Sequence, residues 1–208
     1  MLNYNFFKSQ NDSKQLLVML HGFISDSTTY DSHIEQLSQH VNVLTIDLPG
    51  HGKDTSDMND TWDFPYIAHA LDEVLSQYDM YDVYLLGYSM GGRVALYYAL
   101  NGSVALRGLL LESTSAGIQS EADKVERVQV DAARAKVLEI AGLEIFVNDW
   151  EKLPLFRSQY ELDAEVRKAI RANRMSQNPV RLAKALRDYG TGNMPNLWPH
   201  VSSLSVRT

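Results

Sequence analysis

One serine stands in a pattern that could make it a nucleophile. Residues 87–91 read Gly-Tyr-Ser-Met-Gly, which places Ser89 between two glycines, each two positions away. An apolar run at residues 83–86 precedes the pattern, and residues 93–99 follow it without a helix breaker. Strand, sharp turn and helix in this order are typical of a nucleophile elbow, where backbone comes too close for a Cβ at either glycine. The pattern predicts a strained Ser89 whose hydroxyl lies at a helix N-terminus, where developing negative charge is favoured.

A second motif could supply half of an oxyanion hole. The apolar run at residues 16–20 ends in His21-Gly22-Phe23. In acyl-transfer and related enzymes, one N–H of the hole comes from such a loop and the other from the residue after the nucleophile. We therefore expect the backbone N–H groups of Phe23 and Met90 to face the site. The side chain of His21 is interpreted as a structural group that hydrogen-bonds its own loop.

The elements around these motifs alternate between strand and helix. Residues 4–8, 16–20, 41–48, 83–86 and 106–112 are strand candidates, and residues 64–78 carry apolar side chains at helical spacing. This alternation predicts an α/β fold with a doubly wound, mostly parallel sheet and right-handed crossovers. Asp47, at the end of one strand, is interpreted as a residue that fixes the following Pro-Gly-His-Gly loop rather than as a catalytic acid.

The character of the chain changes after residue 119. Four helical segments are expected there, at residues 121–141, 143–150, 164–175 and 179–189, and no strand is expected between them. One crossover of a sheet needs no such length. We expect an α/β core at residues 1–119, a helical lid over the serine at residues 120–190, and a return to an incomplete core at residues 191–208.

Composition excludes several classes of function. The formal net charge of the 208-residue chain is −7, which argues against a nucleic-acid partner. The chain has no cysteine, and its histidines lack ligand spacing, so we expect neither a disulfide framework nor a metal site. Its first residues are too polar for a signal peptide, and no apolar run is long enough to span a membrane. The composition predicts a soluble cytoplasmic protein without a nucleic-acid or membrane partner. We expect no cofactor, and the sequence does not indicate the oligomeric state.

Three motifs together resemble a known family. His-Gly-Phe at 21–23, Asp-Leu-Pro-Gly-His-Gly at 47–52 and Gly-Tyr-Ser-Met-Gly-Gly-Arg at 87–93 are similar to those of α/β hydrolases. The arginine that ends the third motif, together with Asp149, Trp150 and Pro154, resembles the 2-succinyl-6-hydroxy-2,4-cyclohexadiene-1-carboxylate (SHCHC) synthases of menaquinone biosynthesis. The resemblance runs the length of the chain. It implies an α/β-hydrolase fold and a lyase that eliminates pyruvate from a cyclohexene polycarboxylate.

The resemblance also implies roles for individual residues. Ser89 corresponds to the serine of a Ser-Asp-His triad, and side chains around it correspond to substrate-binding groups: Tyr88, Arg93, Arg127, Trp150 and Arg174. An acidic protein that binds a polyanion must concentrate its cations at the site, and guanidinium groups grip carboxylates with two hydrogen bonds. Arg93, four residues after Ser89, is expected on the same helix face as the serine.

The other two triad members are not evident in the sequence. In this family the acid and then the base follow the serine, but the only later histidine is His200, and the chain ends at Thr208. A triad of Ser89, Asp188 and His200 can be written but is disfavoured, because His200 lies beside Trp198-Pro199 at the exit of the lid, before the position expected for the acid. We expect a chain truncated before both partners, with an exposed edge at residues 106–112, low stability and almost no activity.

Three functions stay open at this point. The leading hypothesis is a lyase in which Ser89, activated by a base, removes a substrate proton while the oxyanion hole stabilises negative charge. The second is a hydrolase that attacks a carboxylate-bearing ester or thioester through a covalent Ser89 intermediate, since a fold does not determine its chemistry. The third is a non-catalytic binding module or inactive relic.

Overall fold

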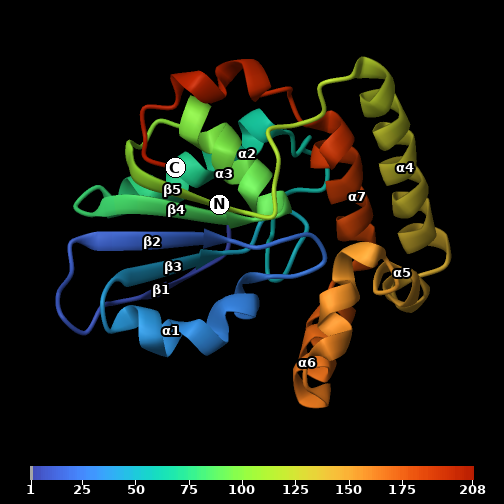
Figure 1. Ribbon diagram of the computed structural model, residues 1–208, viewed down its shortest axis with the longest axis horizontal. Coiled ribbons are helices and arrows are strands. Elements are labelled where there is room, and N and C mark those ends of the chain that lie inside the picture. Colours follow the sequence, from blue (N-terminus) through green and yellow to red (C-terminus); the bar gives the residue numbers. More distant parts are fainter. Residues whose placement is uncertain (1) are drawn as a thin grey trace.

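A computed structural model of the chain describes residues 2–208 and contains one five-stranded sheet (Figure 1). The strands are β1 Tyr4–Phe7, β2 Gln15–Leu20, β3 Asn42–Ile46, β4 Asp82–Tyr88 and β5 Leu106–Glu112. Their order is β1-β3-β2-β4-β5, in which β1 is antiparallel to β3 and all other neighbours are parallel. The predicted mostly parallel sheet is confirmed.

Helices cover both faces of this sheet. Helix α1, Asp31–Ser38, lies on one face, and α2, Phe64–Leu75, and α3, Met90–Asn101, lie on the other (Figure 1). Alternate residues of β2 serve the two faces, as the period of a strand requires. Val18 joins the apolar cluster of α2 and α3, whereas Met19 packs with Val43 in a smaller cluster on the α1 side. The doubly wound arrangement is therefore confirmed.

Element boundaries differ from the predicted ones by a few residues. The strand expected at residues 41–48 is regular only over β3, Asn42–Ile46. The helix expected at residues 64–78 ends at Leu75 and tightens into a 3-10 turn, Ser76–Tyr78. Such tightening is common where the last carbonyls of a helix lose their intrahelical partners.

The segment between residues 121 and 189 is helical in the structure. It contains α4 Glu121–Ile140, α5 Leu143–Trp150, α6 Ala164–Met175 and α7 Pro179–Tyr189, with a 3-10 stretch, Pro154–Glu161, before α6. These helices stand together at one side of the sheet (Figure 1). They share an apolar cluster that includes Leu138, Phe146 and Leu182 and reaches Ile24 of the core. We call residues 121–189 the helical segment.

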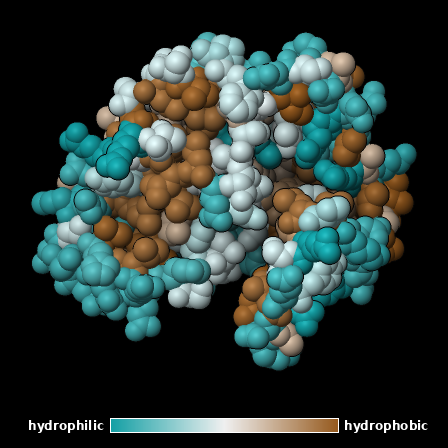
Figure 2. All heavy atoms as spheres, viewed as in Figure 1, coloured by the Kyte–Doolittle hydropathy of each residue, from teal (hydrophilic) through white to brown (hydrophobic). Residues whose placement is uncertain are grey.

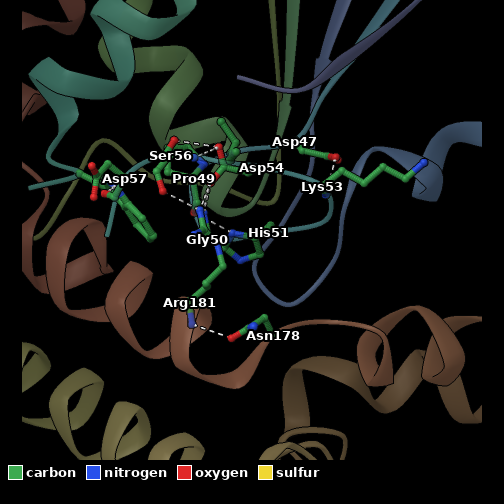
Figure 3. A network of polar contacts seen from close by, with 12 residues as sticks. Asp47, Pro49, Gly50, His51, Lys53, Asp54, Ser56, Asp57, Asn178 and Arg181 are labelled. Atoms are coloured by element: carbon green, nitrogen blue, oxygen red, sulfur yellow. Dashed lines mark hydrogen bonds and ion pairs between the residues drawn. The ribbon is translucent and has the colours of Figure 1, made fainter. Parts of the chain in front are cut away.

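A loop of the core holds this segment in place. The Asp54 carboxylate accepts hydrogen bonds from Gly50 N at 2.8 Å and from Ser56 Oγ at 2.7 Å, and pairs with Arg181 of α7 at 2.6 Å (Figure 3). The Asp54 side chain is fully buried, so its charge depends on these partners. The 49–56 loop is thus fixed internally and joined to α7 by the same carboxylate.

Asp47 fixes the same loop at its other end. Its carboxylate accepts hydrogen bonds from Asn3 Nδ2, from Ser27 N and from Lys53 N, each at 2.8 to 2.9 Å. The side chain is buried and lies outside the cavity that contains Ser89. Its interpretation as a loop-fixing residue is confirmed.

Strand β5 forms one edge of the sheet. Leu110 is 45% exposed, and Figure 2 shows hydrophobic residues gathered over the β4 and β5 side of the molecule. Within residues 191–208, where a return to the core is expected, the chain forms a 3-10 turn, Trp198–Ser203, followed by irregular chain. One hydrogen bond, from Leu109 N to Arg207 O at 2.9 Å, joins that chain to β5. None of the helices within residues 2–208 is long and apolar enough to cross a membrane.

Candidate active site

Ser89 has the strained backbone that its pattern predicts. Its φ is 52° and its ψ is −110°, and α3 begins at the next residue. Ser89 N donates to Glu112 O of β5 at 2.9 Å, and its carbonyl accepts from Arg93 N at 3.1 Å and from Thr114 Oγ1 at 2.9 Å. A non-glycine residue in this region of φ persists only where its surroundings enforce it. These three hydrogen bonds supply that enforcement, which leaves the side chain free for chemistry.

The two glycines of the elbow are required by close backbone contacts. A Cβ on Gly87 would lie 2.3 Å from Gly91 O, and a Cβ on Gly91 would lie 2.2 Å from Leu20 O. Both distances are far below any tolerable contact. The first turn of α3 is therefore packed directly against the end of β2, from which the His21-Gly22-Phe23 loop begins.

A cavity of about 510 Å³ lies above the elbow. It brings together Ser89, Phe23 and Met90, the three residues expected to form the nucleophile and the oxyanion hole. Met90 is almost fully buried, and Phe23 and Ser89 are half-buried at the cavity wall. The remaining walls come from residues 113–115 after β5, from α4, α7 and the 150–156 region, and from Gly190 and Thr191.

Three arginines line this cavity. Arg93 comes from α3, and Arg127 and Arg134 come from α4. Among residues 2–208 the only carboxylate bound to any of them is Asp131, which accepts from Arg127 Nε at 2.9 Å and lies 3.6 Å from Arg134 Nη1. Arg93 Nε is buried without a hydrogen-bond partner among residues 2–208. Burial, and then the charge of Arg127, lowers the pKa of Arg93 to about 10. The cavity is positively charged in a protein whose net charge is negative.

Arg134 was not predicted as a site residue. Its spacing of seven from Arg127 on one helix is the signal that could have revealed it, because residues seven apart lie on the same helix face.

Aromatic side chains form a further part of the cavity wall. Trp150 and Tyr88, both expected in the site, line the cavity, and Trp150 packs on Phe23 with ring centroids 5.4 Å apart. The Arg134 guanidinium lies 5.3 Å from the Trp150 ring centroid, within the range of a cation–π interaction. The aromatic wall therefore orients a cation as well as bounding the cavity.

Arg174 is placed differently from the other predicted arginines. Its Nη1 donates to Glu151 Oε1 at 3.0 Å and its Nη2 donates to Gln159 Oε1 at 2.9 Å, and it packs over the Phe156 ring. It lines a neighbouring cavity of about 720 Å³, which shares Phe23, Tyr88, Trp150 and Phe156 with the first. The structure therefore brings Arg93 and Arg127 to Ser89 and leaves Arg174 bonded behind the aromatic wall.

Two buried histidines lie beneath the oxyanion loop. His21 accepts from Leu48 N at 3.0 Å through Nε2, which leaves Nδ1 to donate to Gly22 O at 2.7 Å. This confirms its structural role. The His51 ring lies 5.1 Å from that of His21 and touches Phe23 edge-on. Burial lowers the pKa of His21, and burial together with the His21 charge lowers that of His51 to about 3. Both support the loop as neutral rings.

No acid or base stands beside Ser89 in the described part of the chain. The residues that line its cavity include no histidine, aspartate or glutamate. Asp188 pairs with Lys184 and accepts from Trp62 N at 2.9 Å, while His200 is exposed. The structure does not bring either of them to Ser89. Residues 2–208 also contain no cluster of three or more histidine, cysteine or acidic residues that could hold a metal ion.

Comparison with known proteins gives a consistent result. The model of the alpha/beta hydrolase family matches residues 17–203. The solved structure of MenH from S. aureus is 57% identical to this chain, with a TM-score of 0.97, and the match covers 99% of this chain and 77% of that one.

Curated proteins give the same picture. A protein of Salmonella agona (strain SL483) named 2-succinyl-6-hydroxy-2,4-cyclohexadiene-1-carboxylate synthase is 34% identical over 91% of this chain and 73% of its own length. A Bacillus subtilis (strain 168) protein that carries the same name provisionally is 33% identical over 94% of this chain and 71% of its own.

Proposed function

The chain belongs to the alpha/beta hydrolase family and, within it, to the SHCHC synthases, and we propose that Ser89, Arg93 and Arg127 form the centre at which it eliminates pyruvate. The observation that carries this assignment is the set of arginines in the serine's own cavity. An esterase for neutral acyl chains has no use for three arginines around its serine, one of which, Arg93, is buried with Nε unpaired within residues 2–208. The desolvation of such a guanidinium costs free energy that an anionic ligand offsets. A substrate with several carboxylates is such a ligand.

The chemical step is a β-elimination or its vinylogous form. In the proposal Ser89 first gives its hydroxyl proton to a base, and its Oγ then takes a proton from a substrate carbon. The carbon–oxygen bond to the enolpyruvyl group breaks, the leaving enolate takes up the proton held by that base, and pyruvate leaves as its enol. The electron pair of the broken C–H bond becomes part of the new ring double bond. Negative charge that develops on the substrate carbonyl is stabilised by the N–H groups of Phe23 and Met90. The proposal assigns no base from the cavity lining, which contains none.

A direct assay of pyruvate tests this proposal on the natural gene product. Pyruvate release is coupled to lactate dehydrogenase, and the loss of NADH absorbance is recorded. We expect Ser89→Ala to lower kcat by at least about 100-fold, as removal of a proton-transfer group does. We expect Arg93→Ala to lower kcat/KM roughly 10- to 100-fold, the range for losing a charged hydrogen bond.

Arg107→Gln provides a matched control, because Arg107 pairs with Asp82 on the exposed edge of the sheet, away from the cavity. An unchanged kcat/KM for Arg93→Ala would contradict the carboxylate-binding role. A stable fluorophosphonate adduct on Ser89 with no pyruvate release would favour the hydrolase hypothesis instead, since the strained serine suits either chemistry. A cytoplasmic location stays a prediction, to be tested by cell fractionation.

A further inference from the structure

We propose that Arg134 binds the terminal carboxylate of the substrate's succinyl side chain, as a third cation beside Arg93 and Arg127. This inference rests on the proposed function and deepens it, because it assigns a substrate group to a residue outside the expected set.

The position of Arg134 fits a ligand-binding role. It lies two helical turns after Arg127 on α4 and lines the same cavity. Its guanidinium lies 5.3 Å from the centroid of the Trp150 ring, and that ring stacks on Phe146 at 5.5 Å. A planar guanidinium held against an aromatic ring loses less conformational freedom when it binds a ligand. Arg134 is therefore oriented before the substrate arrives.

No group in the part of the chain that the structure describes accepts a hydrogen bond from Arg134. Its Nη1 lies 3.6 Å from Asp131 Oδ1, which is too long for a hydrogen bond, and the same oxygen already accepts from Arg127 Nε at 2.9 Å. Arg171 and Arg174 differ, because both bond to Glu151. Among the described residues, Arg134 thus combines a place in the Ser89 cavity with an unused guanidinium fork.

The charge of the cavity calls for a ligand with more than one carboxylate. Three arginines line the cavity, and among the described residues the carboxylate of Asp131, whose side chain is only 3% exposed, pairs with two of them, Arg127 and Arg134. Burial, and then the charge of Arg127, lowers the pKa of Arg134, as it does for Arg93. Anionic groups bound beside these arginines would relieve both effects. The product named for this family has two carboxylates, one on the ring and one on the succinyl chain, and pyruvate adds a third to the substrate.

The arrangement of the arginines indicates which carboxylate Arg134 takes. Arg93 lies one helical turn from Ser89, at the reacting end. The charge of Arg127 acts on both Arg93 and Arg134, and Arg134 lies two helical turns beyond Arg127 on α4. The succinyl chain is the longest flexible arm of the product, and its carboxylate reaches farthest from the ring. The succinyl carboxylate is therefore the group that we assign to Arg134, the arginine two helical turns beyond Arg127.

Kinetics and binding together test this assignment on the natural gene product. We expect Arg134→Gln to raise KM roughly 10- to 100-fold while kcat changes less than about 3-fold, because the contact is remote from the reacting atoms. Arg134→Lys keeps the positive charge without the paired N–H donors of a guanidinium. Its KM is expected to lie between those of the wild type and Arg134→Gln. Arg157→Gln is the matched control: Arg157 is exposed on the helical segment and lines none of the described cavities, so its KM should match the wild type.

Calorimetry with two ligands separates substrate contact from structural support of Trp150. The probes are 2-succinylbenzoate and 2-butanoylbenzoate, which differ in the terminal carboxylate. We expect the wild type to prefer the first roughly 10- to 100-fold, and Arg134→Gln to lose that preference while it binds the second as before. Equal weakening of both ligands, an unchanged preference, or no preference in the wild type would each overturn the proposal. If the wild type released no pyruvate, the proposed function would be refuted instead. The calorimetry measures binding alone and does not depend on that activity.

Discussion

Acidification from pH 8 to pH 5 is expected to destabilise the fold through His51. The ring lies fully buried between the oxyanion loop and α7, where Nδ1 contacts Pro49 O at 3.1 Å and Tyr189 Oη at 3.2 Å. Its Nε2 is buried with no partner within residues 2–208. A proton added there would place a charge in an apolar space with no acceptor to receive it.

The size of the effect follows from the pKa difference between the two states. The unfolded chain binds a proton at His51 with a pKa of 6.5, whereas burial and the charge of His21 lower the pKa in the folded protein to about 3. Since the folded pKa is depressed, the unfolded state binds more protons between these values. Stability is then greatest above pH 6.5 and falls as the pH drops. At pH 5, about 1.5 units below the pKa of the unfolded chain, the free energy of unfolding is lower by ~2 kcal/mol. His21, whose pKa is also lowered, adds a loss of the same sign.

Urea unfolding followed by tryptophan fluorescence at pH 8, 6.5 and 5 measures this dependence. Carboxylates titrate mainly below this range and contribute little. Between pH 8 and pH 5, His51→Gln should lose ~2 kcal/mol less stability than the wild type. His33→Gln, which removes an exposed histidine of α1, should behave as the wild type does. Equal losses in the wild type and His51→Gln would refute the reasoning, because the buried ring would then not be the group that is protonated on unfolding.

Three further outcomes are expected in the same unfolding assay at pH 8. Gly91→Ala should destabilise the fold by about 3 kcal/mol, because its Cβ would lie 2.2 Å from Leu20 O and backbone would have to move. Asp54→Asn should cost about 3 kcal/mol, since it removes the charge that a buried loop and Arg181 share. Arg187→Gln should change stability by only about 0.5 kcal/mol, because its ion pair is exposed. A loss for Arg187→Gln as large as that for Asp54→Asn would contradict the distinction between buried and exposed pairs.

Local features of the fold could be predicted because they are encoded within short stretches. The elbow at residues 87–91 needs only a strand, two glycines and a helix, all adjacent in the chain. The helix starts in the segment after residue 119 could be predicted for a similar reason. Ser120 and Asn178 are polar side chains that cap the following helices, and Gly142, at a φ of 85°, separates α4 from α5.

The placement of the arginines could not be predicted in the same way. Arg174 was expected to bind substrate, but Glu151, twenty-three positions earlier, is its partner in the structure. Arg134 gives no local sign that its fork is free, because Asp131, three positions earlier, would be expected to bond to it on a helix. The competition between Arg127 and Arg134 for one carboxylate oxygen depends on side-chain geometry. A pattern of residue types does not contain that information.

Binding and chemistry consequently depend on different parts of the molecule. The Ser89 backbone is held by β5 and by the close approach of β2, both within the sheet core. Arg127 and Arg134 reach the same cavity only because α4 packs against α7, and α7 is joined to the core through Asp54 and Arg181. Changes in the docking of the helical segment therefore alter how carboxylates are held without altering the strained serine. This separation gives relatives with the same elbow a physical route to different substrates, since the elbow and Arg93 require the sheet core, whereas Arg127 and Arg134 require the helical segment.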